Sequence, residues 1–394
     1  MTDTIKIASL PGWNDPYNPY VDLFYGALAH HGIELADELK MDIDWLRENG
    51  NHLDGIHLHW PEVLWRSFKP TKPNRIRLFL RNKVPGAWRL IKYTDQIQNL
   101  SWYQKFLSLG DKIKGLLYFR KFLAIVRQSK IRIIWTLHNV ENHEGHDVID
   151  RLGYHCLSKA ADLIIFHSEI SKNEFKARYR LKARSVIMPH GNYDGVYPAP
   201  RPRKTVLEET GLRHDLPIVS CLGMLRNYKG LDIACEAIAA LNGEVQFLCA
   251  GLPHSSFNID ALLHQINKLP HAVLLPRFLS EQEFADYVSI SDALLLPYRK
   301  ITGSGALLAA LTLSKGVIAS DLPYFQEVLG KKAEAGVLVP PENASVLAEN
   351  IREYLSIPAE VRNQAARCLA EQYNWAKVVA PIVEIIITWH KHAA

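Results

Sequence analysis

Two cations three residues apart follow a short apolar run in the second half of this 394-residue chain. The run is 217–223 (PIVSCLG), and Arg226 and Lys229 stand just after it in 224–230 (MLRNYKG), before a helical pattern begins. A loop between a strand and a helix lies at the carboxyl edge of a parallel sheet. Arginine binds phosphate as a fork and lysine as a point charge, so this spacing suits one diphosphate. Taken alone, the pair could equally be a solvated helix start.

A second loop of the same type lies within 294–328 of the sequence. An apolar strand ends there at Pro297, a polar stretch with glycine occupies 299–305, and an apolar helix follows. Glycine and hydroxyl residues that lead into a helix leave backbone N–H groups able to bind an anion. The candidate contacts in this loop are Thr302, Ser304, Gly305, Ala306 and Leu307. Two such loops in one half of the chain predict a binding site for a diphosphate.

The apolar pattern around these loops alternates between strands and helices, which predicts an α/β fold with parallel sheets. Expected strands are 5–10, 55–60, 131–137, 161–166, 185–189, 217–223, 245–251, 272–276, 292–297 and 316–320. Four prolines and two glycines in 188–204 indicate a linker. We therefore expect two Rossmann-like, doubly wound domains that face a cleft. Their expected bounds are 1–190, a linker at 191–205, 206–373, and a terminal helix in 374–394 that packs back on the first domain.

The composition is that of a protein that folds in water. The chain is 48% hydrophobic and 22% charged, which is typical of globular domains. No stretch reaches the ~20 apolar residues that span a bilayer, and the first residues lack the basic and apolar regions of a signal peptide. The five cysteines show no CxxC spacing and several stand in apolar runs, which indicates reduced, buried thiols. We expect a cytoplasmic protein.

Together, the motifs of the second half resemble the nucleotide-sugar-binding domain of GT-B glycosyltransferases. The resemblance is strongest to the GT4-like group, which includes bacterial exopolysaccharide and lipopolysaccharide transferases. It rests on GMLRNYKG (223–230), LLLPYR (294–299) and GVIASDLPYFQEV (316–328). It implies that Arg226 and Lys229 bind the diphosphate of a UDP- or GDP-sugar donor, without a cofactor and without a metal ion.

The same resemblance implies further donor contacts and contains one departure. Arg299 and Ser304 fit the form PYRxxxxSG of a bacterial polysaccharide-transferase subgroup and are expected to face the donor, while Glu327 matches the family's final acid. The family carries two glutamates, which face the sugar and the ribose, and these positions hold Ile301 and Ala309 here. Two hypotheses follow: an active hexosyltransferase, and a catalytically inactive GT-B homologue that scaffolds a polysaccharide assembly complex.

In GT-B enzymes the first domain usually carries the acceptor site and often a catalytic His or Asp. His138 follows the expected strand 131–137 at a place that resembles the family's histidine. A neutral imidazole can bond a sugar hydroxyl or act as a base near neutral pH. Asp15 and Glu62 are the other candidate bases, and Gly12 would allow the backbone to approach the donor closely.

Further histidines accompany His138. His57 and His59 alternate along one expected strand, so both face the same side of it. They could take part in the acceptor site, and a half-buried strand with hydrogen-bonded histidines is an equal alternative. The His- and Glu-rich segment 138–146 lacks the i, i+4 spacing of a zinc site, so no metal is expected there.

Residues 66–132 form a basic, aromatic-rich segment with 17 Lys or Arg and two acids. Such a surface is typical of a peripheral protein on an anionic membrane, at ~1 kcal/mol per cation. A basic helical surface over buried aromatics is the alternative, and no nucleic-acid-binding module is visible. We therefore expect a protein at the inner face of the plasma membrane. Its expected reaction moves a sugar to a saccharide acceptor, linked to polyprenyl diphosphate, in bacterial polysaccharide synthesis.

Overall fold

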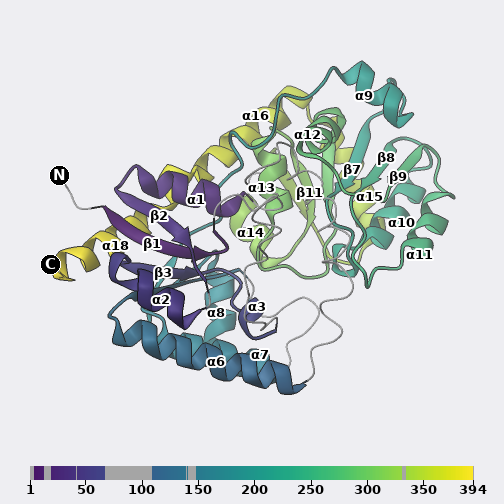
Figure 1. Ribbon diagram of the computed structural model, residues 1–394. Helices are drawn as coiled ribbons and strands as arrows, with labels where there is room; N and C mark the ends of the chain where they lie inside the picture. Colours follow the sequence, from purple (N-terminus) through teal and green to yellow (C-terminus); the bar gives the residue numbers. More distant parts are fainter. Residues whose placement is uncertain are drawn as a thin grey trace, which may run out of the picture. The chain divides into compact units, whose positions relative to one another are not determined.

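The structure is a computed structural model that describes residues 4–12, 19–40, 42–66, 109–138, 140, 148–330 and 334–393. The chain divides into two compact units, drawn in Figure 1 with colours that follow the sequence. Unit 1 comprises Met1–Met188 and Val379–Ala394, and unit 2 comprises Pro189–Val378. The stretch 191–205 therefore lies in unit 2, and the terminal helix α18 (Ala380–Ala393) lies in unit 1.

Unit 1 contains a six-stranded parallel sheet in the order β2-β1-β3-β4-β5-β6. Its strands are β1 (Ile5–Leu10), β2 (Ile33–Glu38), β3 (Gly55–Leu58), β4 (Arg132–Leu137), β5 (Leu163–Phe166) and β6 (Arg184–Ile187). Besides α18, its described helices are α1 (Tyr20–Ala29), α2 (Ile43–Asn49), η1 (Gly50–His52), α3 (Glu62–Arg66), α6 (Leu109–Gln128), α7 (Val148–Ala160) and α8 (Glu169–Arg178).

The two faces of this sheet differ in chemistry. One face packs against α2, α3, α6 and α7 in an apolar cluster that includes Trp65, Phe119 and Trp135. The opposite face carries buried polar side chains, among them His57 and Thr136, and α1 lies over it because Tyr25 of α1 hydrogen-bonds His57. The polar face therefore holds most of the groups in unit 1 that could do chemistry.

Unit 2 contains a second six-stranded parallel sheet, in the order β12-β11-β10-β7-β8-β9. Its strands are β7 (Ile218–Leu222), β8 (Gln246–Ala250), β9 (Ala272–Leu275), β10 (Ala293–Leu296), β11 (Val317–Ser320) and β12 (Gly336–Val339). Its described helices are α9 (Arg203–Thr210), η2 (Asn227–Lys229), α10 (Leu231–Ala240), α11 (Ile259–Ile266), α12 (Glu281–Ile290), α13 (Gly305–Thr312), α14 (Pro323–Leu329), α15 (Ala344–Ser356), α16 (Ala359–Ala370), η3 (Glu371–Tyr373) and α17 (Trp375–Val378).

Local sequence explains why these elements begin and end where they do. Strands β7, β8, β10 and β11 are short apolar runs that are buried throughout, as expected for strands covered on both faces. Ser280 and Glu283 form a capping box that starts α12, and Pro323 stands in the first turn of α14, where its missing N–H costs nothing. The prediction of an α/β fold with parallel, doubly wound sheets is confirmed.

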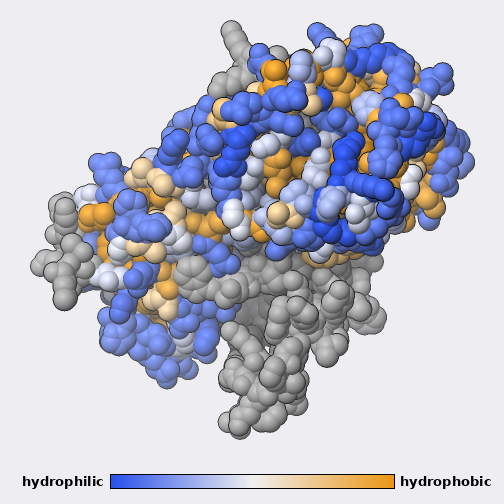
Figure 2. All heavy atoms as spheres, turned by 90° about the horizontal axis from the view of Figure 1, so that it is seen from above, coloured by the Kyte–Doolittle hydropathy of each residue, from blue (hydrophilic) through white to orange (hydrophobic). Residues whose placement is uncertain are grey.

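Hydrophobic and hydrophilic residues are mixed on the molecular surface. On the face drawn in Figure 2, hydrophobic patches lie among hydrophilic residues, and scattered exposure of this kind is normal for folded proteins. No helix among the described residues is long and apolar enough to cross a bilayer. Exposed hydrophobic side chains need an explanation only where neighbouring elements bring several of them together.

Candidate functional site

The strand order of unit 2 reverses between β7 and β10. From β7 the chain continues to β8 and β9 on one side, whereas β10 pairs with β7 on the other side and leads to β11 and β12. In open α/β sheets ligands bind outside the carboxyl ends of the strands at such a reversal. The loops after β7 and β10 are the two loops that the sequence singles out, so the topology brings them together.

Gly230 shows how closely these loops approach each other. It has φ of 63°, and a Cβ atom built on it would lie 2.0 Å from the carbonyl oxygen of Pro297. Only glycine allows both the left-handed backbone and this contact. The backbone after Lys229 therefore lies directly against the residue that ends β10.

Lys229 is buried in this loop, with 9% of its surface exposed. Its Nζ lies 5.6 Å from the ring centroid of Tyr298, next to a small cavity of about 10 Å³. Among the described residues its ammonium group has no hydrogen bond or ion pair. Burial lowers the pKa of Lys229 to about 8, although the nearby Cys221 opposes the shift. A buried cation without a protein partner is costly and is a candidate ligand for an anion.

The N-terminus of α13 lies next to Lys229 through Tyr298. The hydroxyl of Tyr298 hydrogen-bonds the side chain of Ser304, and Ser304 caps α13 by accepting the N–H of Leu307 at 3.2 Å. In the part of the chain that the structure describes, the N–H groups of Gly305 and Ala306 have no hydrogen-bond acceptor. These N–H groups and the ammonium of Lys229 are the components of an anion site.

Tyr193 is a further neighbour of this site, from the segment 190–193 that follows the apolar run 185–189. The resemblance to GT-B enzymes implies that this segment lines the cleft, and a simple turn is the alternative. A Cβ atom on Gly305 would lie 2.6 Å from the Oη of Tyr193, and the backbone N–H of Tyr193 donates to Thr312 Oγ1 at 3.1 Å. Burial raises the pKa of Tyr193, so its hydroxyl stays protonated.

The predicted donor contacts differ in what surrounds them. Arg226 is half-buried, and its Nε lies 3.2 Å from Met224 Sδ. Thr302 is half-buried beside the α13 N-terminus, and Glu327 is exposed on α14. The interior of the site is therefore lined by the buried residues Tyr298, Gly230 and Lys229. Arg226 and Thr302 lie at its edge.

Arg299 is engaged with protein groups. Its guanidinium donates to both carboxylate oxygens of Asp232 at 3.0 and 2.6 Å, to Glu342 Oε1 at 3.0 Å, and to the carbonyl of Asn227 at 3.0 Å. These hydrogen bonds raise its pKa. Arg299 therefore ties the loop after β10 to the η2 turn and to the start of α10.

The two positions where the family has glutamates are apolar and buried. Ile301 is 9% exposed and Ala309 is 2% exposed. Ala309 faces the interior from the middle of α13, where the buried side chains include Leu308 and Leu311. Neither side chain can accept a hydrogen bond, so any polar contact to a sugar or ribose at these positions would have to come from the backbone.

Four histidines meet at the carboxyl edge of the unit 1 sheet. His57 is fully buried and bonds Tyr25 Oη at 2.9 Å and Thr136 Oγ1 at 2.8 Å. His59 Nδ1 lies 3.1 Å from His138 Nε2. The ring of His138 lies 5.0 Å from that of His167. The prediction that His57 and His59 face the same side is confirmed by the 4.0 Å between their ring centroids.

The imidazoles of His57 and His59 are neutral near pH 7. Burial, with smaller effects of His138 and His167, lowers the pKa of His57 to about 3. Burial also lowers the pKa of His59 well below its usual range, and its Nε2 is buried without a partner among the described residues. No group of three or more His, Cys, Asp or Glu in the described residues is placed to hold a metal ion. The cluster is therefore a hydrogen-bonding network that ends at half-buried His138.

Trp60 completes the exposed end of this cluster. Its ring stacks on that of His138, with centroids 4.4 Å apart and planes 16° apart. His167, which donates from Nδ1 to the carbonyl of Met188 at 2.8 Å, was missed by the sequence analysis. It directly follows β5 as His138 follows β4, so the same positional argument could have found it.

The remaining sequence candidates of unit 1 have other surroundings. Glu62 accepts a hydrogen bond from Tyr154 Oη at 3.2 Å, and burial raises its pKa. Gly12 packs against β2, because a Cβ atom on it would lie 2.7 Å from Glu38 Cβ. Asp15 lies outside the described residues, as does most of the His- and Glu-rich segment after His138.

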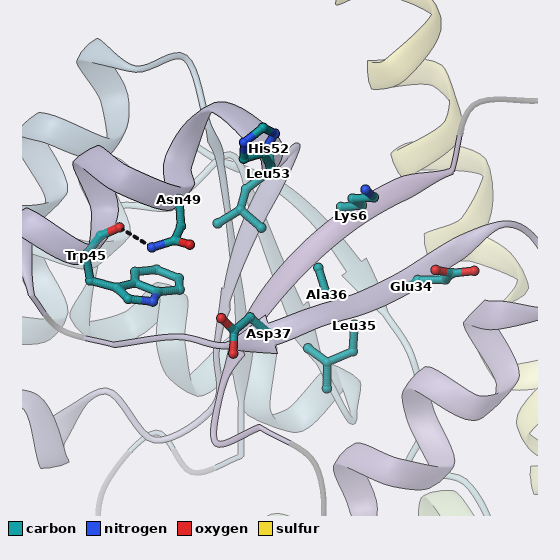
Figure 3. A pocket seen from close by; sticks show the side chains of 9 residues that line it. All are labelled: Lys6, Glu34, Leu35, Ala36, Asp37, Trp45, Asn49, His52 and Leu53. Atoms are coloured by element: carbon teal, nitrogen blue, oxygen red, sulfur yellow. Dashed lines mark hydrogen bonds between the residues drawn. The ribbon is translucent and has the colours of Figure 1, made fainter. Parts of the chain in front are cut away.

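Unit 1 also has a larger cavity, of about 380 Å³, between β2 and α2. Figure 3 shows Trp45 and Asn49 of α2 on one side of it and Lys6 and Ala36 of the strands on the other. Lys6 is its single cationic lining residue, and Glu34 and Asp37 line it too. Such a mixed lining does not suit a diphosphate, which leaves the unit 2 site as the candidate anion site.

Comparison with known proteins relates this architecture to sugar transfer. Residues 216–356 match the family described as Glycosyl transferases group 1. Alpha-D-kanosaminyltransferase of Streptomyces kanamyceticus is 23% identical over 219 residues, covering 54% of this chain and 55% of that protein. Alpha-maltose-1-phosphate synthase of Mycolicibacterium smegmatis is 25% identical over 205 residues, covering 48% and 52%. The chain thus spans about half the length of the curated relatives it matches.

Solved structures agree over nearly the whole chain. Sucrose-phosphate synthase from Thermosynechococcus elongatus superposes with a TM-score of 0.65 and 17% identity, covering 98% of this chain and 100% of that one. Anabaena HepE in complex with UDP and glucose gives 0.66 and 14%, with the same coverage. At these identities the likeness concerns the fold. The resemblance predicted from the motifs is confirmed: the chain has the GT-B fold, and its residues 216–356 match the group 1 glycosyltransferase family.

Proposed function

We propose that this protein is a glycosyltransferase that moves a hexosyl group from a UDP- or GDP-sugar to a saccharide acceptor. The donor diphosphate binds at the carboxyl edge of unit 2, between the loops after β7 and β10. Support comes from the family match of residues 216–356 and from the placement of both loops at the reversal of the strand order. The single observation that carries the proposal is the buried side chain of Lys229, whose ammonium faces the Tyr298 ring and has no hydrogen bond or ion pair among the described residues.

Lys229 is suited to a diphosphate because the fold itself does not use its charge. A structural lysine would pair with a carboxylate, as Arg299 does with Asp232. Lys229 instead has 9% exposure and a pKa lowered to about 8 by burial, so its charge is unfavourable until an anion binds. A pyrophosphate oxygen would supply the missing partner and restore the pKa.

The other groups complete the binding of the leaving diphosphate. The N–H groups of Gly305 and Ala306 point out of the α13 N-terminus, where the helix dipole favours negative charge. Arg226 adds a second cation from the loop after β7. As the glycosidic bond breaks, negative charge grows on the diphosphate, and these groups are preorganised to stabilise it. In this proposal they do so without a metal ion.

His138 is the residue that we assign to the sugar side of the reaction. It is the half-buried end of a network of neutral imidazoles, so it can donate or accept a hydrogen bond at a sugar hydroxyl, or take a proton. Trp60, stacked on it, offers an apolar ring face to a saccharide. Glu62 is a weaker candidate for the base, because Tyr154 and Arg66 already surround it.

The acceptor in this proposal is a saccharide linked to polyprenyl diphosphate, at the inner face of the plasma membrane, in bacterial polysaccharide synthesis. Support is limited to the basic character of residues 66–132 and to the resemblance of the motifs to polysaccharide transferases. The relatives matched above are a kanosaminyltransferase and a maltose-1-phosphate synthase, which leaves a range of acceptors within the family.

Calorimetric titration with UDP-, GDP- and ADP-sugars tests the proposal. One nucleotide should bind with measurable heat, and addition of EDTA should leave its affinity unchanged. If a well-folded sample binds none of them, the proposal fails. That result would favour the second candidate, a non-catalytic homologue that scaffolds an assembly complex. Ile301 and Ala309 are the specific observation for that candidate, since both replace acidic positions with buried apolar side chains.

A further inference from the structure

Several of the large hydrophobic side chains that are exposed in the described residues gather on neighbouring helices of unit 1. They are Val63 of α3 (52% exposed), Ile113 and Leu117 of α6 (41% and 57%), and Val148 and Leu152 of α7 (69% and 45%). The helices α3, α6 and α7 pack against one another, and α6 is the long blue helix on the outside of unit 1 in Figure 1. A cluster of this kind marks an interaction surface.

A buried polar network fixes the positions of these helices. Asp150 of α7 is 1% exposed and accepts hydrogen bonds from Trp65 Nε1 at 2.9 Å and from Arg66 Nε at 2.9 Å. Tyr154 of α7 donates to Glu62 of α3. Gly153 lets the helices approach closely, because a Cβ atom on it would lie 2.6 Å from the Trp65 ring. The exposed residues therefore stand on a rigid platform.

The aromatic side chains at the junction of the three helices show which way the aliphatic ones point. The ring of Trp65 lies 5.2 Å from Phe119 and 5.9 Å from Tyr154, and all three are buried. Val63, Leu117 and Leu152 each precede one of these aromatics by two residues. Because a helix turns about 200° over two residues, these aliphatic side chains point away from the junction.

The outward sides of α6 and α7 also carry exposed cations. These are Lys114, Arg120, Lys121 and Arg127 of α6 and Arg151 and Lys159 of α7. On the described parts of α3, α6 and α7 the acidic side chains of Glu62 and Asp150 are partly or fully buried, and that of Asp111 is 46% exposed. Lys114 lies 3.8 Å from Asp111, and the other five cations have no carboxylate within ion-pair distance among the described residues. Aliphatic residues between cations are the pattern of a helix that lies on an anionic bilayer.

The residues exposed in the structure differ from the membrane contacts that the sequence predicts. The aromatics of 66–132 that fall in described segments, including Phe119 and Phe122, are in the core, as in the alternative of a basic surface over buried aromatics. Aliphatic residues of α3, α6 and α7 are exposed instead, and Val63 of α3 and the whole of α7 lie outside that segment of sequence. Residues 67–108 lie outside the described residues, and the surface is defined without them.

We propose that the outer side of α3, α6 and α7, named the basic face here, docks unit 1 onto an anionic lipid leaflet. Val63, Ile113, Leu117, Val148 and Leu152 enter the interface, and the six exposed cations bind lipid phosphates and other anionic headgroups. The proposal adds a lipid-binding surface to the transferase reaction proposed above. It does not depend on donor binding, because unit 2 contributes no residue to it.

Co-sedimentation of the full-length protein with vesicles tests the basic face. The wild-type protein should bind vesicles that contain phosphatidylglycerol, bind pure phosphatidylcholine vesicles much more weakly, and dissociate as salt is raised. The double variant Leu117→Glu/Leu152→Glu should bind the anionic vesicles at least about tenfold more weakly. Leu263→Glu is the matched control, since Leu263 of α11 is 44% exposed but lies in unit 2, and it should bind as the wild type does.

A second double variant separates the electrostatic contribution to vesicle binding from the apolar contribution. Arg120→Gln/Lys121→Gln should weaken binding by about fivefold for each cation removed, with the difference vanishing at high salt. Titration of each variant with a UDP-sugar reports separately on the fold of unit 2 and on the donor site. The proposal is overturned if the wild type ignores anionic vesicles, which would favour a protein partner for this face. It is equally overturned if Leu117→Glu/Leu152→Glu binds them as tightly as the wild type does.

Discussion

The carboxyl edges of the two sheets have opposite electrostatic characters. The edge of unit 1 holds four packed histidine rings: His57 hydrogen-bonds two hydroxyls, His59 bonds His138, and the pKa of His57 is lowered to about 3. The edge of unit 2 holds the ammonium of Lys229, which faces the Tyr298 ring and has no hydrogen bond or ion pair among the described residues, and a helix N-terminus with two open N–H groups. Protein groups bond most of the histidine nitrogens described at the first edge, although Nε2 of His59 has no partner there, whereas the cationic and N–H groups of the second edge are open to an anion.

This difference separates groups that stabilise the fold from groups kept for a ligand. Hydrogen bonds within the histidine cluster satisfy most of its buried polar atoms, so removing a member should cost stability. The charge of Lys229 opposes folding, so removing it should raise stability and cost function. Functional sites commonly have this second behaviour. Substitutions on the two edges should therefore change stability in opposite directions.

The largest effect is expected for His57→Phe. Loss of the His57 imidazole leaves the buried hydroxyls of Tyr25 and Thr136 without their partner, and each unsatisfied buried group costs about 1–3 kcal/mol. The free energy of unfolding from urea titrations at pH 7 should fall by about 2–5 kcal/mol. His31→Phe is the control, because His31 is exposed, and it should change the value by less than about 0.5 kcal/mol. An unchanged free energy of unfolding in His57→Phe would show that the histidine cluster does not stabilise the fold.

Lys229→Met is expected to change stability in the opposite direction, by raising the free energy of unfolding. The pKa of Lys229 falls from 10.5 to about 8 on folding, so at pH 7 the charged form costs roughly 3 kcal/mol. Because the folded pKa is the lower one, this cost is full below pH 8 and disappears as pH rises toward 10.5. The variant should be more stable by about 1–3 kcal/mol at pH 7 and should lose this gain near pH 10.

Lys315→Met is the matched control for that measurement. Lys315 is also 9% exposed and also has a pKa lowered to about 8 by burial. Its Nζ, however, donates to the carbonyl of Ser289 at 3.3 Å. Its removal leaves that carbonyl without the donor, so Lys315→Met should gain less stability than Lys229→Met. Equal gains in the two variants would contradict the view that Lys229 lacks a partner.

A smaller effect, on nucleotide affinity, distinguishes Arg226 from Arg299. Arg226→Gln should raise the dissociation constant of the bound nucleotide about tenfold, the value of one charge-assisted hydrogen bond. Arg299→Gln should raise it less than about threefold, because its guanidinium is already bound to Asp232 and Glu342. Calorimetry of both variants at one salt concentration measures the difference. A larger loss for Arg299→Gln would mean that it leaves these carboxylates to contact the donor.

The smallest signal is a proton taken up on binding. With a pKa of about 8, Lys229 is mostly neutral at pH 8.5, and a bound diphosphate would restore its charge. Nucleotide binding at pH 8.5 should therefore take up about 0.7 proton, measured by calorimetry in buffers of different ionisation enthalpy. Lys229→Arg should bind without this uptake, because arginine stays charged. Equal uptake in both proteins would assign the proton to another group.

Local sequence predicted the parts of the fold that depend on local pattern. Buried runs such as LIIF and VIAS identify β5 and β11, and Gly230 marks the tight turn after η2. The sequence analysis did not identify β2 or β12. The sequence of β2, IELADE, is rich in acids, and only its first and third residues are buried. At the edge of a sheet a strand pairs on one side only, so its sequence carries a weaker pattern.

The site was predictable as far as it depends on loops after strands. His138 directly follows β4, Lys229 and Ser304 lie in the loops after β7 and β10, and the structure places all three at carboxyl edges. Partners from distant sequence were not predictable: Asp232 and Glu342 bind Arg299, and Tyr193 reaches Gly305. Such contacts are set by how helices pack on a sheet, and no pattern within a few residues of the site encodes them.

Titration of the preferred nucleotide into Lys229→Met at pH 7 tests the central claim most directly. The wild-type protein should bind UDP, GDP or ADP, and Lys229→Met should bind it about a hundredfold more weakly, although it is the more stable protein. Lys315→Met, with the same burial, should bind as the wild type does. If Lys229→Met binds the nucleotide with the wild-type dissociation constant, the diphosphate does not contact Lys229, and the assignment of the donor site is wrong.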